Sequence, residues 1–298
     1  MYNNIDINPN DRILILGHSG YIGKKLYNLL CDRFSHLAID GSSYSSVDLS
    51  LKDDMISIKE FLSENTIVIM CSGIKKQYGD SQEIFSKNIA MVKNICDLLK
   101  ESPVKRFIYF SSAEVYGEEI NNTDIKETTQ VQPSSYYGIA KYTSEVFLKK
   151  VFEQQEQSSL VILRPALVYG PDEQESFYGP CGFIRTALKG EKILLWGDGD
   201  ELREFLFIND LVEAVAGLIF HEFSGTVNIV SGKSYSFKEI INFISIFLPT
   251  LEFVCKPRTR LKVDQGYDNS LLMKLLPNLV FTNLESGVKN IYNIEAKN

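Results

Sequence analysis

Short, continuous apolar runs separated by helical stretches constrain this fold more than any other feature of the sequence. The runs are too continuous for half-exposed strands and too short for helices, so they predict buried parallel strands. They span Arg12–Leu16, His36–Ile39, Thr66–Met70, Arg106–Phe110 and Leu160–Leu163. The helical stretches between them include Tyr21–Asp32, Ser86–Lys100 and Ser135–Glu153. Strands that alternate with helices in this way predict a doubly wound α/β sheet.

The regularity changes after Pro165, where short elements of mixed type follow. We therefore expect residues 1–165 to form a nucleotide-binding domain of the Rossmann type. Residues 166–298 are expected to form mainly a smaller, mixed α/β region that binds the substrate, and its chain can cross back to the sheet. Within this region, Ser236 and Glu239 have the spacing of a capping box, which predicts a helix running to Leu248.

Composition and charge exclude several classes of partner. The 298 residues carry a net charge of −7 without a local basic run, so we expect no nucleic-acid partner. A small anionic ligand is compatible with this charge, because a few amides and arginines can hold a diphosphate. Residues 1–10 lack the basic and apolar segments of a leader, and no stretch reaches the ~20 apolar residues of a membrane span. We expect a cytoplasmic protein without membrane contact.

Cysteine and histidine usage predicts no metal site. The cysteines are odd in number and widely spaced, which is typical of reduced thiols; they are Cys31, Cys71, Cys96, Cys181 and Cys255. The histidines are His18, His36 and His221. A zinc site would need ligands from distant cysteines, so we predict no metal cofactor.

A glycine-rich segment follows the first predicted strand and opens the first predicted helix. Its sequence is Gly17-His-Ser-Gly20-Tyr-Ile-Gly23. Glycines let the backbone turn tightly and approach a pyrophosphate, whose charge then meets the amides at the positive end of the helix. A tight turn without a ligand is the alternative. The predicted cofactor contacts are Gly17, Ser19, Gly20, Tyr21, Ile22 and Gly23.

Two acidic residues extend this expected dinucleotide site. Asp40 ends the second predicted strand, 23 residues after Gly17, where a carboxylate accepts hydrogen bonds from the adenosine ribose diol. A carboxylate there favours NAD, with NADP as the alternative cofactor. Asp48 is expected after a third short strand, where it accepts from the adenine amino group or caps a helix.

A tyrosine and a lysine have the spacing of a proton-transfer pair. Tyr137 and Lys141 lie four residues apart at the start of a predicted helix, so both side chains point from one face. A free phenol titrates near ~10, but an adjacent ammonium favours phenolate. Tyr137 can then exchange a proton with a substrate hydroxyl, while Lys141 holds the nicotinamide ribose. Ser112, which follows the strand Arg106–Phe110, can share that proton.

These motifs resemble the extended short-chain dehydrogenases/reductases, the family of nucleotide-sugar epimerases and dehydratases typified by UDP-galactose 4-epimerase. The resemblance extends from Arg12 to about Val288. Its motifs, in chain order, are Gly17-x-x-Gly20-x-x-Gly23, Ser112-Ala-Glu-Val-Tyr-Gly117, Tyr137-x-x-x-Lys141, Arg164-Pro165 with Val168-Tyr-Gly-Pro171, and Gly197-Asp-Gly-Asp-Glu-Leu-Arg203-Glu-Phe205.

The resemblance implies catalytic roles for particular residues. Ser112, Tyr137 and Lys141 correspond to the family's catalytic triad. Asn88 corresponds to an asparagine with a structural or water-relay role. Glu114 is a further catalytic candidate beside Ser112. Dehydratases often carry an Asp–Glu pair here, and alanine precedes Glu114 instead, which weakens a dehydratase reading.

The resemblance also implies a substrate pocket. Arg203 and Arg258 correspond to arginines that bind the ligand diphosphate, a contact that suits a guanidinium. Trp196 corresponds to an aromatic residue near the base, with a core tryptophan as the alternative. Where the family often has Phe-Asn, this chain has Ala166 and Leu167, which donate no side-chain hydrogen bond.

The leading hypothesis is an NAD(P)-dependent nucleotide-sugar epimerase that forms a transient 4-keto sugar, with Tyr137 as acid and base. The second is an NAD(P)H-dependent 4-keto-sugar reductase, which Leu167 and the short path from Asp40 to Asp48 favour. A dehydratase ranks lower. A non-catalytic dinucleotide sensor is disfavoured because both Tyr137 and Lys141 are present. We further expect a homodimer.

Overall fold

The computed structural model describes residues 8–173 and 179–297, which divide into two compact units. The first unit comprises residues 1–118, 127–165 and 212–228, and the second comprises residues 119–126, 166–211 and 229–298. The chain therefore passes from the second unit back into the first after residue 211.

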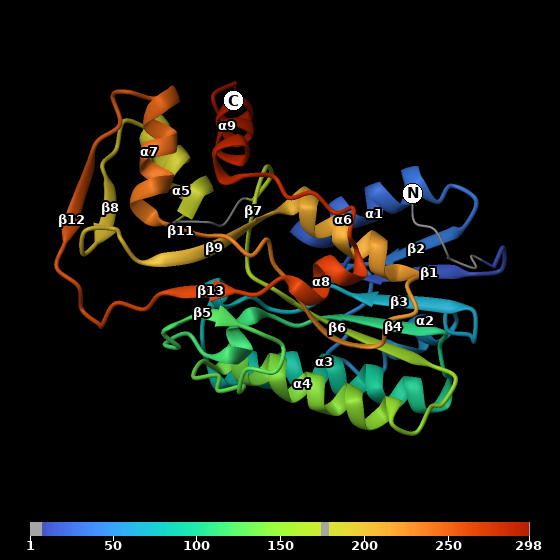
Figure 1. Cartoon of the computed structure of the whole chain (residues 1–298). Helices are drawn as coiled ribbons and strands as arrows, with labels where there is room; N and C mark the ends of the chain where they lie inside the picture. Colours follow the sequence, from blue (N-terminus) through green and yellow to red (C-terminus); the bar gives the residue numbers. More distant parts are fainter. Residues whose placement is uncertain (1–7, 174–178, 298) are drawn as a thin grey trace. The chain divides into compact units, whose positions relative to one another are not determined.

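The first unit is built on a six-stranded sheet in the order β2-β1-β3-β4-β6-β10 (Figure 1). The strands are β1 (Arg12–Leu16), β2 (Ala38–Ser42), β3 (Thr66–Met70), β4 (Arg106–Phe110), β6 (Ser159–Pro165) and β10 (Gly225–Ile229). The pairs among β1, β2, β3, β4 and β6 are parallel. After β2 the chain returns to the other side of β1, so the strand order reverses between β1 and β3. Ligands of open α/β sheets bind at such a reversal, beyond the carboxyl ends of the strands.

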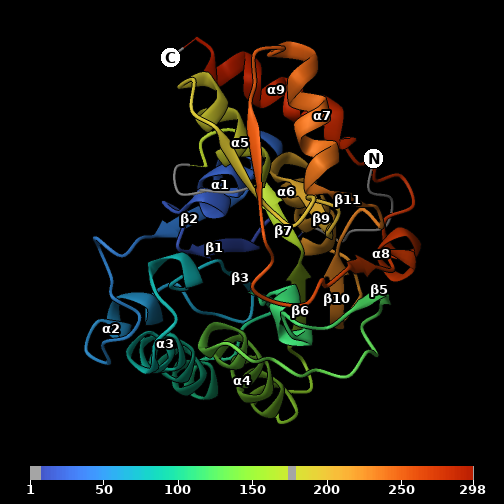
Figure 2. The ribbon, with the colours of Figure 1, turned by 90° about the vertical axis from the view of Figure 1, so that its left-hand side faces the viewer.

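Helices cover both faces of this sheet. They are α1 (Tyr21–Arg33), α2 (Met55–Lys59), α3 (Gln82–Glu101), α4 (Tyr136–Phe152) and most of α6 (Ile208–Ile219), with the 3₁₀ turns η1 (Lys76–Tyr78) and η2 (Ala113–Tyr116). Helices α3 and α4 lie side by side on one face and α1 lies on the other; Figure 2 shows α3 and α4 nearly end-on. Every residue of β3 and β4 is buried, which explains why, after Thr66 and Arg106, their sequences are apolar without alternation.

The expected doubly wound α/β sheet is confirmed, and β1, β3 and β4 have the predicted bounds. The second strand differs. It spans Ala38–Ser42 instead of His36–Ile39, because β2 is an edge strand that pairs only with β1, and the ladder continues to the pair Leu16 and Ser42.

The second unit holds three small sheets, with strand orders β11-β9-β7, β12-β8 and β13-β5. Its strands are β5 (Asn122–Ile125), β7 (Leu167–Tyr169), β8 (Ile193–Trp196), β9 (Leu202–Phe207), β11 (Ser234–Ser236), β12 (Phe253–Lys256) and β13 (Gln265–Tyr267). Its helices are α5 (Gly179–Leu188), α7 (Phe237–Phe247), α8 (Ser270–Leu275), α9 (Leu284–Glu295) and the first residues of α6. A core that includes Phe183, Phe205, Ile240 and Val288 joins α5, α7 and α9 to the sheet residues.

The predicted capping box of α7 is confirmed. The Ser236 hydroxyl accepts a hydrogen bond from the Glu239 amide at 3.1 Å, and the Glu239 carboxylate accepts one from the Ser236 amide at 2.7 Å. These reciprocal bonds satisfy amides that a helix leaves unpaired at its start.

Among the described residues, no helix combines the length and apolar character that a membrane crossing requires. In the same part of the chain, no three His, Cys, Asp or Glu side chains gather as metal ligands would.

Candidate active site

The glycine-rich turn lies between β1 and α1, at the reversal of strand order. Gly17 has a φ of +87°, which L side chains rarely adopt, and a Cβ there would lie 2.7 Å from the Ser72 hydroxyl. A Cβ on Gly23 would lie 2.1 Å from the Gly17 carbonyl oxygen. The turn therefore requires glycine at both positions, and it brings the loop after β1 against the loop after β3.

The start of α1 has the features of an anion site. Gly20 is the N-cap and supplies no side-chain hydrogen bond, and the first turn contains no acidic residue. Gly20 and the neighbouring Ser19 are exposed, whereas Tyr21 and Ile22 are half-buried. A helix that starts without a side-chain acceptor or a negative charge leaves its positive end available to a phosphate.

The two acidic residues do not have the positions that the sequence predicts. Asp40 lies two residues before the end of β2, beside Leu14 in the ladder, and its carboxylate pairs with the Arg12 guanidinium at 2.9 Å. Residues 43–54, all of them described, form turns and bends without the expected third strand. Asp48 instead closes a local turn, in which it accepts hydrogen bonds from the amide and the hydroxyl of Ser50 at 2.9 and 2.7 Å.

Ser112, Tyr137 and Lys141 come together at the carboxyl end of β4. Ser112 caps η2, and its hydroxyl lies close enough to the Tyr137 phenol to lower the pKa of that phenol. The Lys141 ammonium lies 5.7 Å from the centre of the Tyr137 ring and donates to the Phe110 carbonyl at 2.7 Å. Because α4 begins at Tyr136 with Ser135 as its N-cap, both catalytic candidates lie on its first two turns. The predicted proton-transfer group is therefore assembled by β4, η2 and α4.

Asn88 supports this arrangement from α3. Its side-chain amide donates to the Ile74 carbonyl at 3.0 Å, and its oxygen accepts from the Ile74 amide at 2.8 Å. A Cβ on the preceding Gly73 would lie 3.2 Å from the Lys141 nitrogen. Asn88 therefore holds the loop after β3 beside Lys141, and these hydrogen bonds of Asn88 are structural.

Burial and nearby charges set the protonation of these groups. Burial raises the pKa of the Tyr137 phenol above its ordinary value, the charge of Glu114 raises it further, and the Ser112 hydrogen bond lowers it. Burial lowers the pKa of Lys141 to about 8, against the charges of Cys71 and Glu145. Without an added positive charge, Tyr137 is thus a neutral phenol at pH 7, and Lys141 keeps most of its charge.

Glu114 lies close enough to influence Tyr137 electrostatically. Burial raises the pKa of Glu114 to about 7, although Lys76 opposes this shift. The side chain is 30% exposed, but its Oε2 is buried without a hydrogen bond, and the Lys76 ammonium lies 3.8 Å away. The Glu114 carboxyl group therefore loses its proton and becomes negatively charged as the pH rises through neutrality.

In the second unit, the two predicted phosphate arginines meet on one buried carboxylate. The Glu201 side chain is only 7% exposed and accepts from the guanidinium of Arg203, and from that of Arg258 at 2.7 Å. Arg203 also donates to two backbone carbonyls, and Arg258 pairs with Asp200 at 2.6 Å. An anion that binds either arginine must compete with these acids.

Trp196 is 56% exposed, so the alternative of a core tryptophan is wrong. Strand β8 alternates, with Ile193 and Leu195 buried and Leu194 and Trp196 exposed. The indole therefore belongs to the outer face of a two-stranded sheet.

Comparison with known proteins identifies the family. The model of the NAD-dependent epimerase/dehydratase family matches residues 13–230, which is more than half of the chain. The chain belongs to this family. It is 26% identical over 261 residues to the uncharacterized UDP-glucose epimerase YtcB of Bacillus subtilis, covering 78% of this chain and 81% of the relative.

Two further relatives show how far the similarity extends. ADP-L-glycero-D-manno-heptose-6-epimerase of Brachyspira hyodysenteriae is 27% identical over 320 residues, covering 96% of this chain and 98% of that protein. The crystal structure of UDP-glucose 4-epimerase from Thermotoga maritima, which contains UDP-glucose, has a TM-score of 0.82 at 22% identity. The superposition covers 96% of this chain and 100% of that one, so the fold is shared along nearly the entire length.

NAD is the cofactor of this family, and the residues of the phosphate loop fit it. The glycine cradle between β1 and α1 has no room for side chains at Gly17 and Gly23 and leaves the helix start uncapped. A pyrophosphate needs both features, a close backbone and a positive helix end.

The sequence gives no sign of a buried ion pair directly behind the site. Glu145 on α4 is fully buried, accepts from the Ser111 hydroxyl at 2.5 Å, and pairs with the Arg164 guanidinium at 2.6 Å. In the sequence Glu145 follows Lys141 by four residues, which is the spacing of an ordinary surface pair. Asp80 was also missed; its carboxylate accepts from the Tyr137 amide at 3.0 Å.

The Glu114 charge leads to a testable pH effect. Glu114→Gln removes a negative charge that raises the Tyr137 pKa. We therefore expect the limb of the pH–rate profile that reports Tyr137 to move toward lower pH, as measured by kcat/KM across pH. Glu119→Gln is the matched control, because Glu119 is an exposed residue of the same type. A profile identical to that of the parent protein would remove Glu114 from the electrostatics of the site.

Proposed function

We propose that the protein is an NAD-dependent nucleotide-sugar epimerase that forms a transient 4-keto sugar. The observation that carries this proposal is the convergence of Ser112, Tyr137 and the buried Lys141 ammonium, which lies 5.7 Å from the centre of the Tyr137 ring. A phenol that is linked to a hydroxyl and faces a cation can both remove and return a proton, as reversible oxidation of an alcohol requires.

NAD held by these residues would supply the hydride chemistry at C4 of the sugar, as acceptor and then as donor, and its oxidised form would bring a positive charge to the site. The chain supplies the proton chemistry. Tyr137 removes the proton of the C4 hydroxyl and later returns it to the ketone oxygen. Ser112 shares that proton through its hydrogen bond to the phenol, and Lys141, fixed by the Phe110 carbonyl, stabilises the phenolate. Because burial raises the Tyr137 pKa, we expect the phenolate to form only with oxidised cofactor present.

The cofactor's other contacts follow from the same proposal. We assign the pyrophosphate to the backbone of Gly17, Ser19 and Gly20 and to the start of α1, with Tyr21, Ile22 and Gly23 in its first turn. Asp40 is proposed to accept from the adenosine ribose. Its pairing with Arg12 partly neutralises the carboxylate, so its discrimination against NADP is expected to be modest. For Asp48 the contact with Ser50 supports the turn, and a bond to adenine is the weaker assignment.

A 4-keto-sugar reductase is the second candidate. Two features support it. Ala166 and Leu167 donate no side-chain hydrogen bond to a ligand, and the short path between Asp40 and Asp48 has no third strand. A reductase must release oxidised cofactor at every turnover, whereas an epimerase keeps it.

The two candidates are separated by where the hydride ends up. The purified protein is offered UDP-, dTDP-, GDP- and CDP-hexoses and their 4-keto-6-deoxy derivatives, with and without NAD(P)H, and both absorbance and product are followed. An epimerase is expected to interconvert a saturated sugar nucleotide without added reduced cofactor. Stoichiometric loss of NAD(P)H with a ketosugar, and no isomerisation of any saturated sugar nucleotide, would establish the reductase instead.

We further propose that Arg203 and Arg258 bind the substrate diphosphate, with Trp196 near the base. A charge-assisted contact to phosphate contributes ~1.5–3 kcal/mol. Arg203→Ala should therefore weaken binding of a nucleoside diphosphate by roughly 10- to 100-fold, as measured by calorimetry, at ~1.4 kcal/mol per decade.

Glu201 provides the complementary test. Because its carboxylate occupies both guanidinium groups, Glu201→Gln is expected to tighten nucleoside diphosphate binding. Lys262→Ala is the control for charge, since Lys262 belongs to the same cluster but pairs with Asp200 and Asp264. If Arg203→Ala and Lys262→Ala weaken binding equally, the effect is long-range charge and Arg203 makes no direct contact.

We propose a homodimer that associates through α4. Large apolar and aromatic side chains are exposed along this helix: Tyr136, Ile139, Tyr142, Val146 and Phe147. The intervals from Tyr136 to Val146 are three or four residues, which puts these side chains on one face, and Phe147 adjoins them; contiguous apolar surface on a folded unit is typical of an interface. The free cysteines fit a reducing compartment such as the cytoplasm.

A further inference from the structure

A cavity in the first unit lies at the amino ends of the strands of the sheet. The proposed function does not use it. It has a volume of about 270 Å³ and is lined by residues that include Ile67, Arg106, Ser159, Ile219 and Phe220. Ile67, Arg106 and Ser159 stand at or next to the first residues of β3, β4 and β6. The phosphate loop and Ser112 follow the opposite, carboxyl ends of β1 and β4, so the two sites are separate.

Among the described residues that line this cavity, Arg106 is the buried cation without a counter-charge. It is only 7% exposed, and its Nε is buried without a hydrogen-bond partner. Its Nη2 donates a hydrogen bond to the Phe223 carbonyl. Within residues 8–173 and 179–297, no carboxylate pairs with it. Burial lowers the pKa of Arg106 to about 10, and no neighbouring acid opposes that shift.

Two other cations of the first unit, one buried and one lining the cavity, are paired with carboxylates, whereas the buried Lys141 donates to the Phe110 carbonyl. Arg164, which is equally buried, holds Glu145 at 2.6 Å. Lys105, which also lines the cavity, holds both oxygens of Asp11 at 2.8 Å. A buried charge without a partner is costly, so a buried guanidinium that no carboxylate pairs with indicates that an anion from solution completes it.

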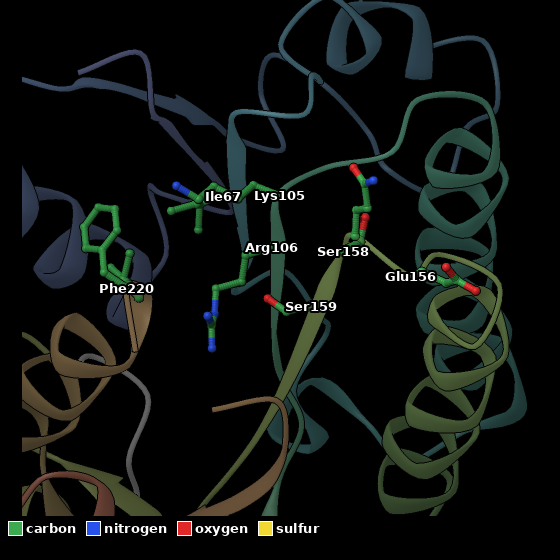
Figure 3. A pocket seen from close by; sticks show the side chains of 9 residues that line it. Ile67, Lys105, Arg106, Glu156, Ser158, Ser159 and Phe220 are labelled. Carbon is green, nitrogen blue, oxygen red and sulfur yellow. The ribbon is translucent and has the colours of Figure 1, made fainter. Parts of the chain in front are cut away.

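The surroundings of Arg106 suit a small tetrahedral oxyanion. Ser159 is its direct neighbour in the β4–β6 register, and Figure 3 shows the Ser159 hydroxyl beside the guanidinium, with the Glu156 carboxylate away from both. A guanidinium and a hydroxyl together donate in the pattern that phosphate oxygens accept. Ile67 and Phe220 supply apolar walls, and Lys105, Gln157 and Ser158 supply further polar groups. A water occupies ~30 Å³, so the cavity can hold an ion with several waters.

We propose that this cavity is an anion site, distinct from the active site, in which Arg106 and Ser159 bind a phosphate group. The phosphate comes either from the free ion or from a small phosphate monoester. Because the site exists only in the folded chain, its ligand is expected to stabilise the protein by mass action.

The test follows the melting temperature of the full chain as inorganic phosphate is added. NAD and UDP are kept saturating so that the phosphate loop and the Arg203 cluster are filled, and sodium chloride holds the ionic strength constant. We expect the melting temperature to rise with phosphate concentration. Glycerol phosphate in place of phosphate distinguishes a monoester site, where it acts at lower concentration, from a free-ion site. No rise with either compound means that the cavity holds only water, and the proposal is then wrong.

Two variants and one control locate the effect. Arg106→Gln should abolish the phosphate-dependent rise. Ser159→Asp places a carboxylate at the neighbouring position of the ladder, so it should raise the melting temperature without phosphate and also abolish the response. Lys59→Gln, which removes an exposed charge paired with Glu101, should keep the full response. If Arg106→Gln does not fold, Ser159→Asp decides, and a full phosphate response in that variant overturns the proposal.

Discussion

Tyr137→Phe is expected to lower turnover by on the order of 10²–10⁴-fold, the usual contribution of a positioned acid or base. Only the phenolic oxygen is lost, and it is the atom proposed to exchange the proton with the substrate hydroxyl. Neither remaining member of the group can replace it. The Ser112 hydroxyl is a far weaker acid than a phenol, and the Lys141 ammonium is held by the Phe110 carbonyl at 2.7 Å. The variant should therefore bind NAD and sugar nucleotide and yet fail to transfer the proton.

The matched control is Tyr136→Phe, the same change on the adjacent, exposed residue of α4. Both variants are assayed for single-turnover rate and for NAD retained through purification. Loss of rate in Tyr137→Phe with retained NAD, and an unchanged Tyr136→Phe, support the assignment. A Tyr137→Phe enzyme that keeps most of the parent rate would show that another group carries the proton.

The central strands were predictable from the sequence because their environment is simple. Residues of β3 and β4 are buried on both faces, so a run of apolar residues without alternation marks the body of each strand. At the edge this signal fails. In β2 only Ser42 is buried, and the strand's end is set by pairing with β1, which apolar content does not encode.

Strand β10 could not be predicted for a related reason. Its five residues, Gly225–Ile229, contain few apolar positions and lie far along the chain from the other strands of the sheet. They form a strand because β6 offers an unpaired edge, and that edge exists only after the sheet has formed. The sixth strand is therefore a product of long-range pairing.

The same distinction separates the predicted part of the site from the missed part. Tyr137 and Lys141 belong to one helix, so their spacing alone puts them on one face. Glu145 lies on that helix too, but its partner Arg164 lies near the end of β6, and its partner Ser111 directly follows β4. Nothing local distinguishes this buried glutamate from a solvated one. The arginine cluster around Glu201 is likewise assembled from β9 and the segment after β12.

Arg164→Met is expected to lower the free energy of unfolding by ~3–5 kcal/mol, the usual effect of removing one partner from a buried ion pair. Glu145 has no exposed surface and Arg164 is 3% exposed. The variant therefore leaves the Glu145 carboxylate buried beside the Ser111 hydroxyl, with the Lys149 ammonium 3.9 Å away. Denaturant unfolding measures the loss. Lys59→Met is the control, because that lysine forms an exposed pair with Glu101 and should change stability little.

The double variant Glu145→Leu with Arg164→Met separates the charge from the packing. Replacing both partners of a buried pair by apolar side chains is often neutral, so the double variant should recover much of the stability that Arg164→Met loses. The activity of the double variant is expected to be lower than that of the parent protein, because Ser111 then loses the acceptor that fixes the segment leading to Ser112. If the double variant is as unstable as Arg164→Met, the pair stabilises the fold through shape and not through charge. If Arg164→Met unfolds like the parent protein, the pair contributes nothing to the fold.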